Sequence, residues 1–202
     1  MIQPKEWLEF GQKFHGHKCP AMPLGLRLAA AAMNKLGVGR AMDGQLQAFI
    51  DIGENHCATC FADGVQVITG CTLGKGNIEK THKGKWALTL IDKKNKKAVY
   101  VSAKGESMKM SKESPFITEY RSKGIPASQV PEEIAKPAID RVMDAPDENL
   151  FNISDIFDYD FQEAQHSFNG FICEECGDMT VMEYGRIKGD KKVCMDCAAK
   201  ID

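Results

Sequence analysis

Residues 24–36 carry apolar side chains on nearly every side of a helix and are rich in Leu and Ala, which favour helix. Gly37 then provides a stop signal. We therefore expect a central helix here, whose small Ala and Gly faces suit core packing and a subunit contact equally well. Upstream, Trp7, Phe10 and Phe14 recur at helical spacing and indicate a short amphipathic helix around residues 1–13.

The second apolar pattern is alternation, which predicts strands. In residues 45–52 the apolar side chains share one face, and the pattern ends at Gly53. Residues 85–91 and 98–102 predict two further strands, joined by a lysine-rich hairpin tip. Helix-compatible segments occur at 61–69 and 128–143, and prolines punctuate residues 106–150.

Composition narrows the class of protein. The chain has 202 residues, 43% apolar and 27% charged, as in an ordinary globular protein. A net charge of −2 gives no electrostatic basis for binding nucleic acid or an anionic membrane. The first residues lack the apolar run of a signal peptide, and no apolar segment is long enough to cross a bilayer. We therefore expect a cytoplasmic protein whose cysteines are metal ligands or reactive thiols rather than disulfides.

The last 30 residues contain two CxxC pairs separated by 17 residues. The four cysteines are Cys173, Cys176, Cys194 and Cys197. Four thiolates at this spacing can surround one zinc ion in a closed structural site. Metal binding would then stabilise a module too small for a core of its own. Two disulfides or a redox dithiol are the alternatives.

A second group of ligand-type residues lies near the start of the chain. In an extended backbone His15, His17 and Cys19 would point the same way, and imidazole and thiol groups suit zinc or a similar metal. The loop after the first strand adds His56, Cys57 and Cys60. A set such as His17, Cys19 and Cys60 would leave a coordination position open for substrate. Alternatively, the Cys57–Cys60 CxxC pair is a redox dithiol, or these are buried core residues.

Residues 61–77 supply polar candidates. Asp63 and Gln66 share a helix face, and a glycine-rich loop with Lys75 follows. The loop is not a P-loop, because three residues rather than four precede its Gly-Lys pair and no Ser or Thr follows. Contact between Lys75 and an anion and a plain tight turn explain the glycines equally well.

Three motifs occur in order: Phe14-His15-Gly16-His17-x-Cys19-Pro20, Cys60-x-x-Asp63-Gly64-Val65-Gln66 and Gly70-Cys71-Thr72-x-Gly74-Lys75-Gly76-Asn77. Together they resemble the FmdE family, named for the FmdE component of formylmethanofuran dehydrogenase. The cysteine-rich tail resembles the DksA/TraR zinc finger. The resemblance implies an α+β core, often dimeric, with central helices on an antiparallel-rich sheet. It also implies a cleft holding His15, His17, Cys19, Cys60, Asp63, Gln66, Cys71 and Lys75. The unusual His56-Cys57 segment leaves open which of Cys57 and Cys60 binds a metal.

These observations give an expected organisation: a core domain over 1–150, an ordered connection over 151–168 and a zinc module over 169–202. The first functional hypothesis is an accessory or small-ligand-binding protein of molybdenum or tungsten formylmethanofuran dehydrogenase-type or redox metabolism, associated with that oxidoreductase and homodimeric. Here His17, Cys19 and Cys60 hold a zinc-like ion, and Cys19, Cys60 and Asp63 are the catalytic candidates. His15, Gln66, Cys71 and Lys75 are the ligand-binding candidates. The alternatives are a thiol redox enzyme and a zinc-finger regulator that binds nucleic acid or polymerase.

Overall fold

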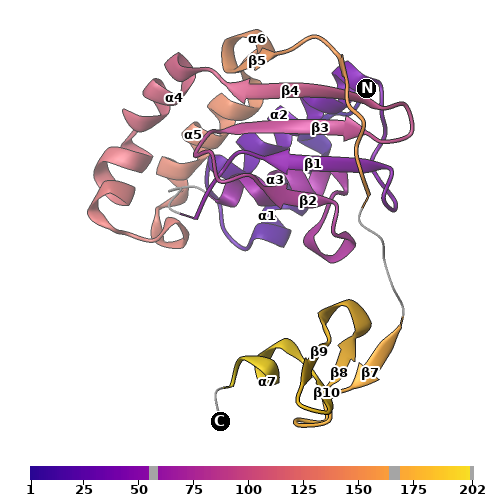
Figure 1. The fold of residues 1–202 in the computed structure, drawn as a ribbon. Helices are drawn as coiled ribbons and strands as arrows, with labels where there is room; N and C mark the ends of the chain where they lie inside the picture. Colours follow the sequence, from indigo (N-terminus) through magenta and orange to yellow (C-terminus); the bar gives the residue numbers. More distant parts are fainter. Residues whose placement is uncertain (55–58, 164–168, 201–202) are drawn as a thin grey trace. The chain divides into compact units, whose positions relative to one another are not determined.

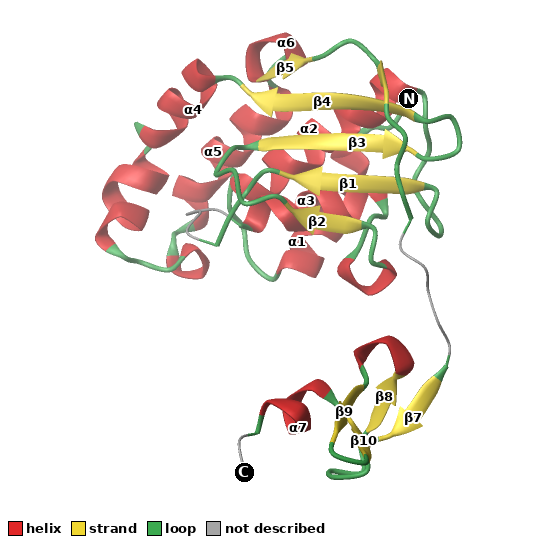
Figure 2. Cartoon of the chain, viewed as in Figure 1, coloured by secondary structure: helices red, strands yellow, loops and turns green. Residues whose placement is uncertain are grey.

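The computed structural model describes residues 1–54, 59–163 and 169–200. It divides into two compact units, Met1–Phe161 and Gln162–Asp202. The larger unit contains one mixed sheet with a layer of helices on one face (Figures 1 and 2). The smaller unit contains two hairpins and a short helix.

The sheet has the strand order β2-β1-β3-β4-β5. Its strands are β1 (Leu46–Ile50), β2 (Ile78–Lys80), β3 (Ala87–Asp92), β4 (Lys97–Ala103), β5 (Phe151–Ile153) and β6 (Phe157–Asp158), the last paired with β4. β1 and β2 are parallel, and every other pairing is antiparallel. The expected α+β fold with an antiparallel-rich sheet is therefore confirmed. The short strands β2, β5 and β6 were not predicted.

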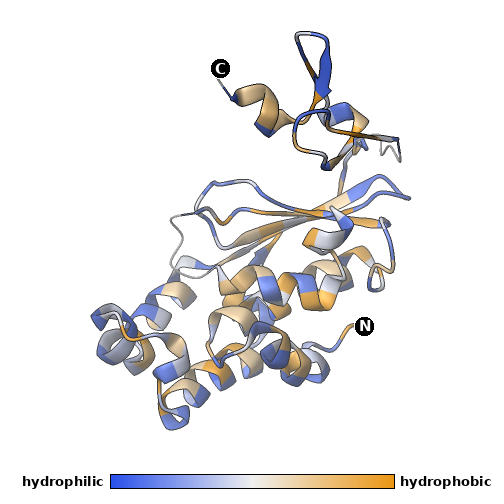
Figure 3. Cartoon of the chain, turned by 90° about the horizontal axis from the view of Figure 1, so that it is seen from below, coloured by the Kyte–Doolittle hydropathy of each residue, from blue (hydrophilic) through white to orange (hydrophobic). Residues whose placement is uncertain are grey.

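The helices of the larger unit are mostly short. They are η1 (Pro4–Trp7), α1 (Leu8–His15), α2 (Ala21–Leu36), α3 (Cys60–Thr69), η2 (Leu73–Lys75), α4 (Gly105–Lys112), the π-helical η3 (Phe116–Tyr120), η4 (Arg121–Lys123), η5 (Ala127–Gln129), α5 (Glu132–Asp144) and α6 (Asp147–Leu150). Figure 3 shows hydrophobic residues in both the strands and the helices beneath them. The core lies between these two layers.

Helix α2 occupies the centre of this core, as its all-round apolar pattern predicts. Every residue from Ala21 to Met33 is buried. Two glycines let α2 and α3 approach closely, because a Cβ on Gly25 would lie 2.1 Å from the Phe61 carbonyl oxygen, and one on Gly64 2.1 Å from that of Met22. Small residues of α2 thus serve packing within the chain.

One buried cation joins α2 to the end of α5. Arg27 donates to the carbonyl oxygens of Val142, Met143 and Ala145 at 2.7–2.9 Å and to the Asp147 carboxylate at 2.5 Å. A guanidinium with several acceptors satisfies carbonyls that the helix end leaves unpaired. The C-terminal turn of α5 is thereby fixed against the core.

The face of the sheet opposite the helices is partly covered by residues that follow β6. Phe49 of β1 packs against Tyr159 and Phe161, with ring centroids 6.4 and 6.1 Å apart. Because side chains alternate along a strand, Phe49 points away from the face that carries Ala48 and Ile50. The described part of the connecting segment is therefore packed on the larger unit.

The smaller unit is built around its cysteines. Its elements are β7 (Gly170–Ile172), β8 (Met179–Val181), η6 (Met182–Tyr184), β9 (Arg186–Lys188), β10 (Lys191–Val193) and α7 (Met195–Ala199). Its buried hydrophobic residues, within the described range, are only Cys173, Val193 and Cys197. So small an apolar cluster needs another source of stability, such as a metal ion.

Candidate metal centre

Three helix ends converge to form a His/Cys cluster in the larger unit. His15 is the last residue of α1, Cys19 lies just before α2, and Cys60 begins α3. The expected extended backbone from His15 to Cys19 is wrong at its first step. Gly16 adopts a left-handed conformation with φ of 87° and ends α1 there. The side chains converge because the chain reverses, not because a strand alternates.

The four donor atoms lie within 4.8 Å of one another. His15 Nε2 is 3.0 Å from His17 Nε2 and 3.6 Å from Cys19 Sγ. His17 Nε2 is 3.9 Å from Cys60 Sγ. No other part of the described core unit gathers so many soft donors.

These distances can be tested against a tetrahedral zinc site. Zinc–nitrogen bonds of about 2.05 Å and zinc–sulfur bonds of about 2.3 Å give edges of about 3.3 Å between two nitrogens and about 3.6 Å between nitrogen and sulfur. The observed 3.0, 3.6 and 3.9 Å lie within a few tenths of an ångström of these edges. A donor set of two imidazoles and two thiols therefore fits zinc in both chemistry and size.

A hydrogen-bonded chain fixes His15 from behind. His15 Nδ1 lies 2.7 Å from Asp63 Oδ2, and the His15 side chain is only 6% exposed. Gln66 donates to the other Asp63 oxygen at 3.2 Å and accepts from the Leu73 backbone amide at 3.1 Å. If Nδ1 carries the proton, Nε2 keeps a lone pair for a metal. Such a carboxylate–histidine pair typically stands behind a metal ligand.

Without a metal, the cluster is strongly polarised. The hydrogen bond to Asp63 is the main cause that raises the pKa of His15 to about 9. The hydrogen bond with Cys19 is the main cause that lowers the pKa of Cys60 to about 4, with His15 assisting. The same contact and burial raise the pKa of Cys19. The two sulfurs thus share one proton, with Cys60 as the thiolate.

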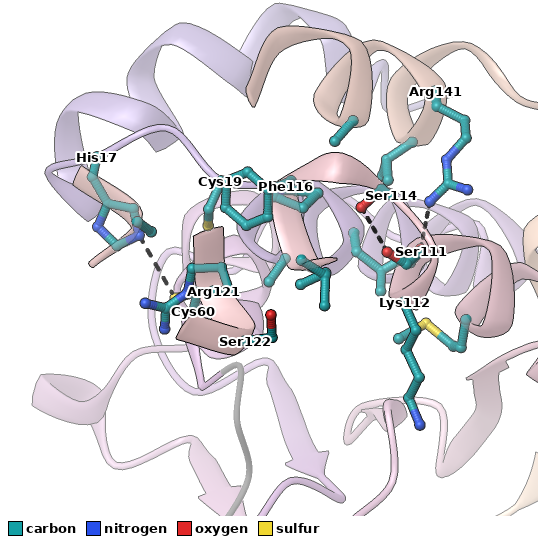
Figure 4. Close-up of a pocket in the computed structure, with 18 of the residues that line it drawn as sticks. His17, Cys19, Cys60, Ser111, Lys112, Ser114, Phe116, Arg121, Ser122 and Arg141 are labelled. Atoms are coloured by element: carbon teal, nitrogen blue, oxygen red, sulfur yellow. Dashed lines mark hydrogen bonds between the residues drawn. The ribbon is translucent and has the colours of Figure 1, made fainter. Parts of the chain in front are cut away.

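A cavity of about 540 Å³ adjoins the cluster. His17, Cys19 and Cys60 line one end of it, whereas His15 does not. Figure 4 shows Ser111, Lys112 and Arg141 at the opposite end from His17 and Cys60. Three of the four donors therefore face a space large enough for a small organic molecule.

Some residues expected at the site lie elsewhere. Cys71 is fully buried just after α3 and is not part of the cluster, and burial raises its pKa to about 11. Lys75 donates to the carbonyl oxygens of Ala41 and Met42 at 3.1 and 3.3 Å, which explains the glycine-rich loop as a local structural turn. His56 and Cys57 lie outside the described residues.

Several cavity residues were missed from the sequence. They are Trp86, Ser111, Lys112 and Arg141, among others. All but Trp86 come from the proline-punctuated stretch, where isolated polar residues form no motif. The uneven composition of that stretch was the only signal that it folds as a separate wall.

The tail holds a second cluster, Cys173, Cys176, Cys194 and Cys197, again with sulfurs within 4.8 Å. The Cys176 and Cys194 sulfurs are 3.9 Å apart. Backbone amides of Cys194 and Cys197 donate to the sulfurs of Cys173 and Cys194. Amides directed at sulfur stabilise thiolates, which are the metal-binding form.

The molecule thus combines an α+β domain, bearing a His/Cys cluster beside a cavity, with a four-cysteine finger. The family model for FmdE, described as the molybdenum formylmethanofuran dehydrogenase operon, matches residues 14–152. The prokaryotic DksA/TraR C4-type zinc finger matches residues 167–202. The chain belongs to the FmdE family, and the resemblance found in the sequence is confirmed.

Two individual proteins are also similar. A probable S-adenosyl-L-methionine-binding protein of Archaeoglobus fulgidus is 33% identical over 206 residues, which is 93% of this chain and 51% of that protein. The chain therefore spans about half the length of this curated relative. The crystal structure of an FmdE-like protein of tungsten formylmethanofuran dehydrogenase from Syntrophus aciditrophicus matches with a TM-score of 0.61 at 20% identity, covering 97% of this chain and 92% of that one. In the described ranges we find no helix with the length and apolarity to cross a membrane.

Proposed function

We propose that the core unit binds one zinc-like ion on His15, His17, Cys19 and Cys60 and presents it to a small ligand in the adjoining cavity. The carrying observation is the set of donor distances, which matches the edges of a zinc tetrahedron. When bound, the ion would supply a Lewis-acidic centre at the end of the cavity. The four tail cysteines would hold a separate structural zinc.

The chain's own residues have distinct parts in this proposal. Asp63 orients His15 and keeps its proton on Nδ1, and Gln66 holds Asp63 in turn. Asp63 is thus a positioning residue rather than the general base considered from the sequence. A core packed only for stability would not need two imidazoles and two thiols directed at one point.

For the biological role, we infer an accessory or small-ligand-binding protein of formylmethanofuran dehydrogenase-type or redox metabolism. Membership of the FmdE family supports this role, including association with a molybdenum or tungsten oxidoreductase. Transfer of the Archaeoglobus protein's ligand name to this cavity is disfavoured. S-adenosylmethionine carries a sulfonium and an ammonium, and no Asp or Glu is found among the described residues that line the cavity. Homodimerisation is part of the proposal, and light scattering of the purified protein tests it.

Metal analysis by mass spectrometry tests the central claim. Wild-type protein should contain one ion for each cluster, and Cys19→Ser should lose the core ion while retaining the tail ion. Cys176→Ser should show the converse. Cys71→Ala is the matched control, because this cysteine lies outside both clusters. An unchanged total in Cys19→Ser would refute the core metal site.

A thiol redox function is the second candidate, favoured by the adjacency of the Cys19 and Cys60 sulfurs. A disulfide between them would form with loss of two electrons and two protons to a dithiol-oxidising partner. Diamide treatment followed by peptide mapping tests this function. A Cys19–Cys60 disulfide that forms in metal-loaded protein and is reduced by dithiothreitol supports it, and resistance to oxidation rules it out.

A further inference from the structure

The cavity beside the His/Cys cluster has a charge bias that the metal proposal does not use. Its lining includes three cations, Lys112, Arg121 and Arg141. Among the described lining residues there is no carboxylate to balance them. A cavity with only positive side chains attracts anions and excludes cations.

One of these cations is fixed at the far end of the cavity. Arg141 of α5 donates to the Ser111 hydroxyl, and Ser114 donates to the Ser111 carbonyl oxygen (Figure 4). The acceptor of Arg141 is therefore a neutral group in the described part of the chain. A guanidinium has five N–H donors in a planar fork, so further donors of Arg141 can meet a planar oxyanion.

The middle of the cavity is apolar. Leu24, Phe116 and Val142 are buried residues of its wall, and Met108 and Trp86 are half-buried. An apolar wall of this size favours a hydrocarbon or aromatic body over a sugar or nucleotide. The positive end and the cluster end lie on opposite sides of this wall (Figure 4).

We propose that the cavity binds an organic carboxylate with an apolar body, its carboxylate paired with Arg141 and Lys112 and its other end directed at the His/Cys cluster. The orientation toward the cluster rests on the proposed function, because it assumes that the metal centre is the reactive end. A planar carboxylate matches the arginine fork with two parallel hydrogen bonds. A phosphate dianion usually recruits several backbone amides, and the lining offers mainly side chains.

Octanoate is a suitable probe, with octan-1-ol and octyltrimethylammonium as neutral and cationic analogues of the same length. Trp86 lines the cavity and gives a fluorescence signal once the other tryptophan is removed by Trp7→Phe. Octanoate should bind at least about tenfold more tightly than octanol, since charge-assisted hydrogen bonds exceed neutral ones by this order. Octyltrimethylammonium should not bind.

Variants then locate the carboxylate. Arg141→Gln should weaken octanoate about tenfold or more and leave octanol unchanged, whereas Arg141→Lys should recover part of the loss. Lys112→Gln should have a smaller effect, because this side chain is exposed. Lys109→Gln is the matched control, an exposed lysine of the same helix that does not line the cavity. Thermal melting confirms that each variant is folded.

Equal affinity for octanoate and octanol would overturn the inference, as would equal losses of both in Arg141→Gln. The metal proposal is tested separately by repeating the titration with Cys19→Ser and by counting metal in every variant. Octanoate selectivity in a wild-type protein found to have only the tail ion would refute the metal site alone. A retained core ion without octanoate selectivity would refute the carboxylate site alone.

Discussion

The hydrogen bond from His15 to Asp63 should control metal affinity at the core cluster, and Asp63→Asn is the sharpest perturbation of it. The substitution preserves shape and removes only the charge and one acceptor. In the wild type one carboxylate oxygen faces His15 Nδ1 at 2.7 Å and the other faces the Gln66 amide nitrogen at 3.2 Å. Both contacts require an acceptor on Asp63.

An asparagine cannot satisfy both neighbours. If its oxygen faces His15, its amide group opposes the amide group of Gln66, and Gln66 is held in place because its oxygen accepts from Leu73. If its amide group faces His15, the imidazole must accept at Nδ1. The proton then moves to Nε2, which is the nitrogen required for the metal. Either orientation weakens ligation.

The expected loss in zinc affinity is about 10- to 100-fold, or about 1.4–2.8 kcal/mol, as for other groups that orient metal ligands. Cobalt substitution provides the assay, because the core site, with two imidazoles and two thiolates, and the tail site, with four thiolates, have different visible spectra. Competition with a chelator then gives the affinity of each site in the intact chain. Glu9→Gln is the matched control, since Glu9 is an exposed carboxylate on α1 that pairs only with Lys13 among the described residues.

Proton binding provides an independent measurement of the same contact. In metal-free protein the pKa of His15 is raised from 6.5 to about 9, chiefly by Asp63. Its contribution to stability is therefore complete below pH 6.5 and lost as the pH rises through 9. Asp63→Asn should shift the His15 titration, followed by NMR, toward its ordinary range and remove this pH dependence. Unchanged cobalt affinity and an unchanged His15 pKa would refute the reasoning.

Three further predictions concern the rest of the molecule. Gly25→Ala should destabilise the core by about 2–3 kcal/mol in urea unfolding, because its Cβ would overlap the Phe61 carbonyl, whereas Gly74→Ala, with open space around it, should change stability by less than about 0.5 kcal/mol. Removal of metal with a chelator should increase hydrogen exchange throughout residues 169–200 and leave the core strands protected, and uniform protection would contradict a structural tail ion. In metal-free protein at neutral pH, iodoacetamide should modify Cys60 and spare Cys71, as their pKa values of about 4 and about 11 require, and peptide mass spectrometry would expose equal labelling.

Periodicity predicted the parts of the fold that bury an apolar face. Helices α2 and α3 and strands β1, β3 and β4 all fall within the segments expected from the sequence, within a few residues at their ends. The short strands were missed for a physical reason. β2 has only three residues, and it is held by parallel pairing with β1 rather than by an apolar face of its own. Local pattern cannot reveal a strand specified by its neighbour.

The site shows a similar division. Residue chemistry and order identified His17, Cys19 and Cys60 as a group, and the structure brings their side chains together with His15. The sequence could not identify Arg141, because a lone arginine on an amphipathic helix has the ordinary appearance of a solvated face. Its place in the cavity depends on α5 being fixed through Arg27, whose contacts with the end of α5 join distant parts of the chain.

The placement of His15 shows why a correct grouping can follow from an incorrect geometry. Alternation along a strand would put His15, His17 and Cys19 on one side but would leave His15 no nearer to Asp63 than the others. The turn at Gly16 instead places His15 at a helix end, with one ring nitrogen at the carboxylate and the other at the donors. Only this arrangement divides the two nitrogens between an orienting group and a metal, so the turn makes His15 a candidate ligand rather than a bystander.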